Sequence, residues 1–226
     1  DNATTLFSVT SGTGAYYSGN SAAGDSPATT TFVSNGTHSF GKSNGSVSVT
    51  TTNINTTALA SPQLSFKVAS FSIASTGNGA DGTDIVTVEI SADGGNTYNS
   101  TVRVVGNTNA RWSFTSGTGV ASTAYDGDAT PVDFTPAAGG ARTTDGYSTV
   151  TVTGLPSTTN MRVRITLVNN TVNERWLIDN FTISPAPANV SGYNSLSVAG
   201  TTQTVTGLSS NTTYGYVVRT VGTNTT

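Results

Sequence analysis

Residues 81–114, DGTDIVTVEISADGGNTYNSTVRVVGNTNARWSF, form the stretch that decides the fold. Its first half alternates apolar and polar residues with a period of two, which is typical of a strand with one buried face. Residues 92–96, ADGGN, tolerate the positive φ angles that a chain reversal requires. After this turn the alternation resumes at Val102 and Val104. The stretch therefore predicts a long β-hairpin in the middle of a β-sandwich.

The same period of two recurs along the chain, and no apolar period of 3.6 residues is long enough to predict a helix. Further strands are expected at residues 6–9, 38–41, 47–50, 64–73, 147–153, 161–167 and 174–183. Residues 12–31 and 115–144 are expected to be loops. Many short strands joined by Gly and Asn turns indicate an all-β, antiparallel sandwich.

The composition bears on the location of the protein and on the partners and sites that it can have. Of the 226 residues, 35% are hydrophobic and only 9% charged, and the net charge is −3. A polar but uncharged surface is common in extracellular β-proteins, and the absence of a basic patch argues against a nucleic-acid partner. The chain has no cysteine, which excludes disulfides and thiolate sites. No apolar run of about 18 residues predicts membrane insertion, and the first residues do not resemble a signal peptide, so the leader of a secreted protein would already be gone.

A second pattern begins after a proline-rich linker at residues 185–189. Residues 190–226 predict strands around Val198, at residues 204–206 and at residues 214–218. Gly207-Leu208 followed by Tyr214 has the spacing of a tyrosine corner, in which the Tyr hydroxyl bonds back to the backbone.

Two resemblances follow from these motifs. Residues 61–184 resemble jelly-roll modules of the concanavalin A-like or MAM-like type in large secreted proteins of Bacteroidota, and residues 1–60 are expected to complete that sandwich. The motifs are SPQLSF at 61–66, DIVTVEISADGG at 84–95, NARWSF at 109–114 and ERWLIDN at 174–180. Residues 190–221 resemble the second half of a fibronectin type III domain. Such proteins are commonly exported by the type IX system and include adhesins, filaments and tethered enzymes, so the resemblance implies an extracellular or cell-surface location.

The fibronectin-like segment is incomplete. A complete sandwich of this type needs about seven strands, and only about 40 residues follow Pro185. An incomplete sandwich exposes strand edges. The chain could continue beyond Thr226, the segment could pack on the jelly roll, or another copy could supply a strand. The third route is a head-to-tail contact, which builds a filament when it does not close.

Asp179 is the first candidate metal ligand. Simple alternation places it inward with Phe181 and Ile183, where a carboxylate needs a cation or several donors. The resemblance to jelly-roll modules implies a structural Ca²⁺ near the closing strand, and oxygen ligands suit that ion. Asp81 and Asp84 are the alternative ligands, although their sequence, DGTD, is also that of an ordinary turn. The competing interpretation of Asp179 is a β-bulge, or hydrogen bonds to loop amides.

Nothing in the sequence predicts a catalytic site. The chain has a single histidine, His38, and it lacks the Gly-x-Ser-x-Gly motif that would supply the nucleophile of a Ser-His-Asp site. The only glutamates are Glu89, expected to be exposed, and Glu174, expected to form an edge pair with Arg175. Asp126, Asp128 and Asp133 do not complete an EF-hand loop and are expected to be solvated.

The aromatic residues divide by context. Trp112 and Trp176 lie in strand-like runs and are predicted to be core. Tyr98 and Tyr125 lie in loops and are the candidate carbohydrate-binding residues. Asn-x-Ser/Thr sequons supply candidate glycosylation sites at Asn35, Asn55, Asn99 and Asn211.

The sequence thus favours a non-catalytic, extracellular structural or adhesive module, assembled with copies of itself into a surface filament by strand complementation. The alternative is a carbohydrate-binding module with glycan partners. A third interpretation is an accessory domain of a hydrolase.

Overall fold

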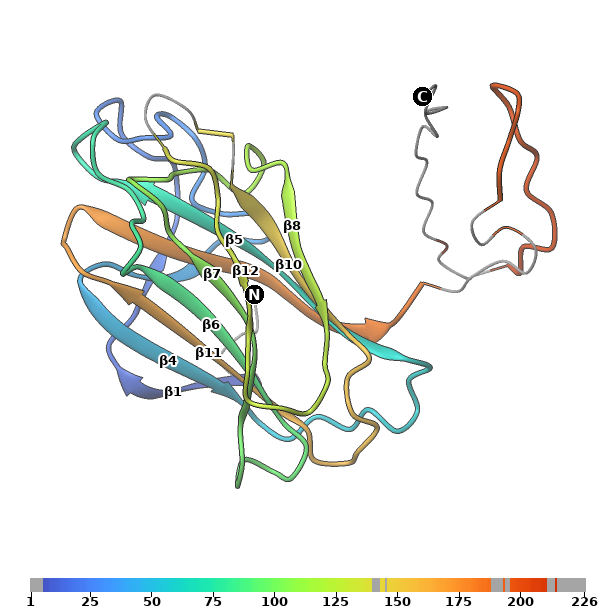
Figure 1. The fold of residues 1–226 in the computed structure, drawn as a ribbon. Helices are drawn as coiled ribbons and strands as arrows, with labels where there is room; N and C mark the ends of the chain where they lie inside the picture. The colour runs from blue at the N-terminus through green and yellow to red at the C-terminus, as the bar shows by residue number, and fades with distance from the viewer. Residues whose placement is uncertain are drawn as a thin grey trace, which may run out of the picture. The chain divides into compact units, whose positions relative to one another are not determined.

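Figure 1 shows the computed structural model of the chain, which describes residues 6–139, 143–144, 146–187, 193, 196–210 and 214. All elements formed by these residues are β-strands, as the sequence predicts. None of the described residues belongs to a helix long and apolar enough to cross a membrane. The chain divides into two compact units, Asp1–Pro185 and Ala186–Thr226, which are considered separately.

The first unit is a sandwich of two six-stranded sheets, seen as two facing layers in Figure 1. The first sheet has the order β1 (Phe7–Gly12), β4 (Gly45–Thr51), β11 (Arg162–Asn169), β6 (Ile85–Ser91), β7 (Asn99–Val105) and β9 (Val132–Phe134). The second has the order β2 (Ala15–Tyr17), β3 (Ser39–Lys42), β12 (Glu174–Pro185), β5 (Pro62–Ser72), β10 (Tyr147–Thr153) and β8 (Gly119–Ala124).

The predicted central hairpin is confirmed. Strands β6 and β7 pair antiparallel, with Val88 opposite Val102. The apolar residues of β6 at positions 86, 88 and 90 are all buried, because one face of the strand lies on the core.

The two sheets are mixed rather than purely antiparallel, which corrects the sequence-based expectation. Strand β8 pairs parallel with β10, and β9 pairs parallel with β7. Both strands, and β2, lie in segments that were expected to be loops. They are short edge strands that bury few side chains, so their sequences carry little of the alternation that reveals a strand.

Two tryptophans occupy the core, as predicted. Trp112 and Trp176 are fully buried and pack edge to face, with ring centroids 5.5 Å apart. Each indole N–H donates to a backbone carbonyl, Trp112 to Val68 (3.1 Å) and Trp176 to Val168 (3.0 Å). The two polar atoms that the rings bring into the core are therefore satisfied.

The second unit has no strand among its described residues, so the strands expected at Val198 and at residues 204–206 are not formed. The backbone hydrogen bond expected of the tyrosine corner is present, since the backbone N–H of Ser209 donates to the hydroxyl of Tyr214 (2.8 Å), but no described strand flanks it. Residues 216–218 of the last predicted strand lie outside the described residues. The described part leaves three large apolar side chains about half exposed: Leu196, Val198 and Leu208.

Candidate metal centre

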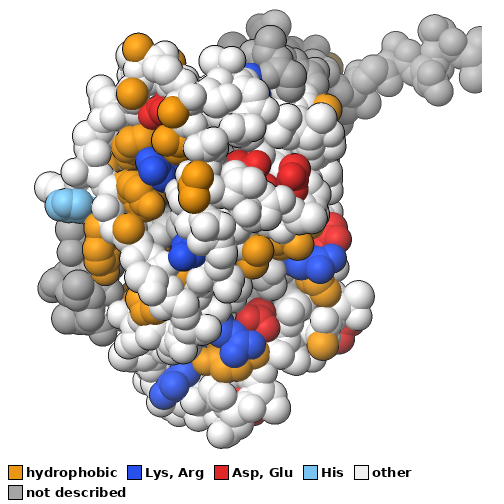
Figure 2. Space-filling model, turned by 90° about the vertical axis from the view of Figure 1, so that its left-hand side faces the viewer, with side chains coloured by type: hydrophobic (Ala, Val, Ile, Leu, Met, Phe, Trp, Pro, Cys, Tyr) orange, Lys and Arg blue, Asp and Glu red, His pale blue; other side chains and the backbone are white. Residues whose placement is uncertain are grey.

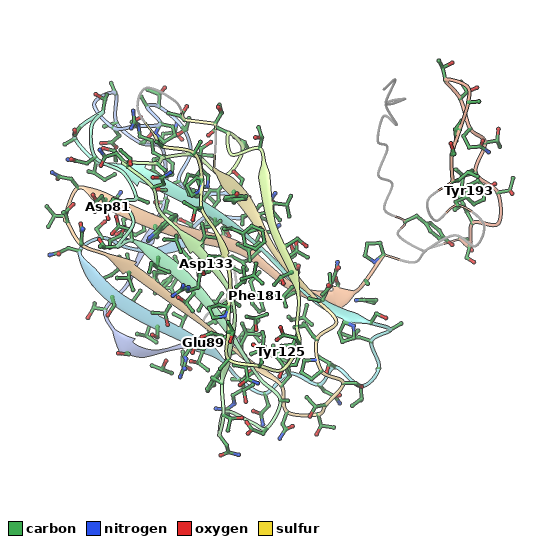
Figure 3. The ribbon with its side chains drawn as sticks, in the orientation of Figure 1. Asp81, Glu89, Tyr125, Asp133, Phe181 and Tyr193 are labelled. Carbon is green, nitrogen blue, oxygen red and sulfur yellow. The ribbon has the colours of Figure 1, made fainter. Side chains whose placement is uncertain are left out.

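Three carboxylates from segments of the two different sheets lie close together. Asp81 and Asp84 lie in the turn that leads into β6 of the first sheet, and Glu174 is the first residue of β12 in the second sheet. One oxygen from each of the three carboxylates lies within 4.8 Å of the others. Figure 3 places Asp81 toward one end of the sandwich, and Glu89 and Tyr125 toward the other. A cation held here would join one sheet to the other.

The turn sequence DGTD orients the two aspartates. The Asp81 carboxylate accepts hydrogen bonds from the backbone N–H (2.8 Å) and hydroxyl (2.7 Å) of Thr83, as in an Asx-turn. The Asp84 carboxylate accepts from the backbone N–H of Asp81 (2.8 Å) and of Asn170 (2.8 Å). Since Asn170 lies in the connection from β11 to β12, these bonds fix the turn against that connection.

Two of the three carboxylates in the cluster are buried, and the third, that of Asp81, is half-buried. Asp84 is 0% and Glu174 4% exposed. Burial, followed by repulsion from Asp84, raises the pKa of Glu174 to about 7. Burial also raises the pKa of Asp84, whereas the backbone N–H of Thr83 lowers the pKa of Asp81.

One atom of the cluster is left without a partner. Glu174 Oε2 is buried and has no hydrogen-bond donor. A buried carboxylate oxygen in this state is costly unless a proton or a cation meets it. The three side chains offer only oxygen ligands, which suit a hard divalent cation.

Glu174 is the member that the sequence analysis missed, and the expected edge pair with Arg175 is wrong. The Arg175 guanidinium instead lies 4.2 Å from the centroid of the Tyr17 ring and donates to the Ser43 hydroxyl (3.2 Å). A signal for the burial of Glu174 was available. Alternation places Glu174 on the same face as Trp176, which was itself predicted to be core.

Asp179 does not join Asp81 and Asp84. Its carboxylate accepts hydrogen bonds from the backbone N–H groups of Ser34 (2.7 Å) and Asn35 (3.0 Å). The register of β12 shifts after Asp179, where Asn180 adopts a φ of 51°. The structure therefore shows the alternative that the sequence analysis gave for Asp179, a β-bulge with hydrogen bonds to loop amides. The third carboxylate beside Asp81 and Asp84 is that of Glu174 rather than that of Asp179.

One of the candidate carbohydrate-binding residues, Tyr125, contacts Asn99, which follows the other, Tyr98, in the chain. The Asn99 side-chain amide donates to the Tyr125 hydroxyl (3.4 Å) and to the carbonyl of Gly127 (2.7 Å). Tyr98 is half-buried, and the Arg164 guanidinium covers one face of its ring at 4.1 Å from the centroid. Tyr125 is half-buried and packs partly against the core, so neither ring is a freely exposed platform.

The other acidic residues have local roles. Glu89, expected to be exposed, is half-buried and pairs with Arg164 at 2.6 Å. Asp133 pairs with Arg103 across β9 and β7, also at 2.6 Å. Asp126 and Asp128 are exposed, as expected.

The candidate glycosylation residues differ in accessibility. Asn35 and Asn55 are exposed. Asn99 is half-buried and its amide is engaged as described above. Asn211 lies outside the described residues.

Comparison with known proteins adds little to this geometry. No family model matches the chain, and no curated protein matches it. A solved structure of an exo-β-agarase is similar at 10% sequence identity and a TM-score of 0.37. The match covers 82% of this chain and 24% of the agarase chain. This chain therefore spans about a quarter of the agarase chain, and a likeness this distant carries no argument about activity.

Proposed function

We propose that this chain is a non-catalytic structural module of an extracellular assembly, and that Ca²⁺ bound by Asp81, Asp84 and Glu174 ties its two sheets together. The observation that carries the Ca²⁺ site is the unpartnered, buried Glu174 Oε2 in a cluster of three carboxylates. The chain has no cysteine, so disulfides cannot join the sheets, and a bound cation is one other way to do so.

Ca²⁺ is favoured over other cations by the ligand set. It takes six to eight oxygen ligands in flexible geometry, and carbonyls and waters can complete the coordination. Mg²⁺ demands a near-ideal octahedron and dehydrates reluctantly. Extracellular modules bind Ca²⁺ with dissociation constants of about 10⁻⁴ to 10⁻³ M, which suits a site with one partly exposed ligand.

Thermal unfolding tests the metal site. Saturating Ca²⁺ should raise the Tm of the EDTA-treated protein, because an ion that binds only the folded state stabilises it by mass action. At a hundredfold excess over the dissociation constant the gain is about 2.7 kcal/mol. Equimolar Mg²⁺ should raise the Tm less. An unchanged Tm at 10 mM Ca²⁺ would remove the metal from the proposal.

The role in assembly is supported by the edges of the sheets. Strands β1, β2, β8 and β9 end the two sheets of the described residues, and their exposed backbone edges can pair with another copy. Electron microscopy of the native material should show fibres with a regular axial rise. Material that remains monomeric at every concentration tested would contradict the assembly role.

A carbohydrate-binding module is the second candidate, because the Tyr125 hydroxyl accepts a hydrogen bond from Asn99, the residue that follows Tyr98. A glycan array distinguishes the two functions. Selective binding that is lost in both Tyr98→Ala and Tyr125→Ala would favour glycan recognition over a purely structural role.

A further inference from the structure

Asn169, the last residue of β11, has a buried side chain whose oxygen atom has no partner. The side chain is 1% exposed, and its Oδ1 atom receives no hydrogen bond from any described residue. The amide nitrogen is satisfied, because Nδ2 donates to the backbone carbonyl of Lys42 in β3 (2.7 Å). That bond determines which end of the carboxamide is the oxygen. A buried carbonyl oxygen in this state is costly unless a donor or a cation meets it.

The register of the first sheet places Asn169 beside Asp84. Strands β6 and β11 pair antiparallel as far as Ile85 and Val168, so the next residues along the two chains, Asp84 and Asn169, lie opposite each other. Both side chains are buried and therefore lie on the core face. Residues opposite each other in an antiparallel pair have Cβ atoms about 4.5–5.5 Å apart. The hydrogen bond from the backbone N–H of Asn170 to the Asp84 carboxylate (2.8 Å) holds the two segments together here.

Glu174 reaches the same place from the second sheet. It is buried on the same face of β12 as Trp176, two residues further on. The Trp176 indole N–H donates to the backbone carbonyl of Val168, the residue before Asn169 (3.0 Å). Lys42, which accepts the Asn169 amide, is the partner of Trp176 in the second sheet. The start of β12 therefore lies against the end of β11, with Glu174 and Asn169 both facing the core.

The orientation of the carboxamide turns its oxygen toward the carboxylates. Asn169 pairs with Gly45 of β4 on one side and lies opposite Asp84 on the other. Lys42 lies three residues before Gly45, so Nδ2 points to the β4 side. Because Nδ2 and Oδ1 lie on opposite sides of the carboxamide carbon, Oδ1 is directed to the Asp84 side. An amide beside anions alone would gain by offering them its N–H groups, whereas an amide beside a cation offers its oxygen.

A Ca²⁺ ion in this cluster needs neutral oxygen ligands as well as charged ones. It takes six to eight oxygens, and the cluster has three carboxylates. Figure 2 views the molecule from the side on which Figure 3 places Asp81. Acidic side chains (red) are few in that view, and most of the surface is white, the colour of backbone and uncharged polar side chains.

We infer that Asn169 Oδ1 is a fourth protein ligand of the Ca²⁺ held by Asp81, Asp84 and Glu174. The inference rests on the proposed metal site and adds a neutral ligand to it. A cation at Oδ1 polarises the carboxamide and strengthens the hydrogen bond from Nδ2 to Lys42. Since Asn169 belongs to the first sheet and Lys42 to the second, the ion reinforces a link between the sheets that already exists.

Two substitutions at one position separate a ligand from a merely structural asparagine. Both Asn169→Leu and Asn169→Asp lose the donor to Lys42, but only the aspartate keeps an oxygen for the ion. In calorimetric titrations with Ca²⁺, we expect Asn169→Leu to bind about tenfold more weakly, because water must replace a protein ligand. Asn169→Asp should bind at least as tightly as the unmodified protein. Asn99→Leu is the matched control, since Asn99 Nδ2 also donates to a backbone carbonyl at 2.7 Å, and it should leave the affinity unchanged.

Bound water gives a second measurement, which a loss of stability alone does not alter. Eu³⁺ replaces Ca²⁺ at oxygen sites, and its luminescence lifetimes in H₂O and D₂O count the waters on the ion. Asn169→Leu should carry about one more bound water than the unmodified protein, and Asn99→Leu the same number.

The outcomes distinguish this ligand from the proposed metal site. Equal affinity in Asn169→Leu and the unmodified protein, or equal weakening in Asn169→Leu and Asn169→Asp, would overturn the role of Asn169. If Asn169→Leu does not fold, Asn169→Asp decides: a Ca²⁺-induced rise in Tm at least as large as that of the unmodified protein supports the ligand, and a smaller rise overturns it. If Glu174→Gln weakens binding and Asn169→Leu does not, only the inference about Asn169 fails. If the unmodified protein binds neither Ca²⁺ nor Eu³⁺, the proposed metal site fails together with it.

Discussion

Replacing Glu174 with glutamine tests the electrostatics of the carboxylate cluster, because the change keeps the side-chain shape and removes one charge. In metal-free protein, Glu174 and Asp84 are buried within a group of three carboxylates. Glutamine at position 174 would relieve the repulsion and could donate to a neighbouring carboxylate. We therefore expect Glu174→Gln to be more stable than the unmodified protein in EDTA at pH 8.

The magnitude follows from the pKa of Glu174, which rises from 4.5 to about 7 on folding. The folded state holds this proton more tightly than the unfolded state, so the stability of the metal-free protein falls as the pH rises from 4.5 to 7. The full difference corresponds to roughly 3 kcal/mol above pH 7. Because Asp81 is partly exposed, solvent screens part of the repulsion. We therefore expect ionised Glu174 to destabilise the metal-free protein by about 2 kcal/mol. For a domain of this size that is a Tm increase of about 4–8 °C.

The assay is thermal unfolding of both proteins in EDTA and in 10 mM Ca²⁺, at pH 4 and pH 8. At pH 4 in EDTA the two Tm values should converge, since Glu174 is then protonated. In Ca²⁺ at pH 8 the order should reverse, because the variant lacks a ligand. Glu89→Gln is the matched control: it breaks the ion pair with Arg164, should lower the Tm slightly, and should keep the full response to Ca²⁺.

Two results would refute this reasoning. A lower Tm for Glu174→Gln in EDTA at pH 8 would show that the ionised carboxylate is stabilised by groups other than a metal. An equal response to Ca²⁺ in the variant and the unmodified protein would show that the ion does not bind at Glu174.

Three further predictions concern the sandwich itself. A methyl group on Gly146 would overlap the Trp112 ring, so Gly146→Ala should lose about 1–3 kcal/mol or more in denaturant unfolding. Gly24→Ala, where nothing lies within 4 Å, should change little, and equal effects of the two changes would contradict the packing around Trp112. Asp179→Ala should lose only about 1 kcal/mol, because the Ser34 and Asn35 N–H groups that lose their acceptor are exposed and can bond to water, and it should keep the Ca²⁺-induced increase in Tm; loss of that increase would place Asp179 in the metal site. Asp133→Asn breaks an exposed pair with Arg103 and should change stability by less than about 1 kcal/mol, and a larger loss would show that the pairing of β9 with β7 depends on it.

The sequence by itself determined the strands that bury a full face. Strand β6 and the two tryptophans were predictable because their apolar residues repeat with the period of the pleat, which depends only on local geometry. The hydrogen bond from Ser209 to the Tyr214 hydroxyl was also predictable, since the two residues are close in the chain. The short edge strands β8 and β9 were not, because they bury too little to be patterned.

The metal centre required the tertiary structure. Asp84 and Glu174 are far apart in sequence and belong to segments that enter different sheets, so only the packing of one sheet on the other brings their carboxylates together. The change in alternation along β12 likewise depends on a bulge at Asn180, whose position no period reveals. Local periodicity specifies which side chains face inward along a regular strand, whereas the contacts between sheets decide which buried carboxylates become neighbours.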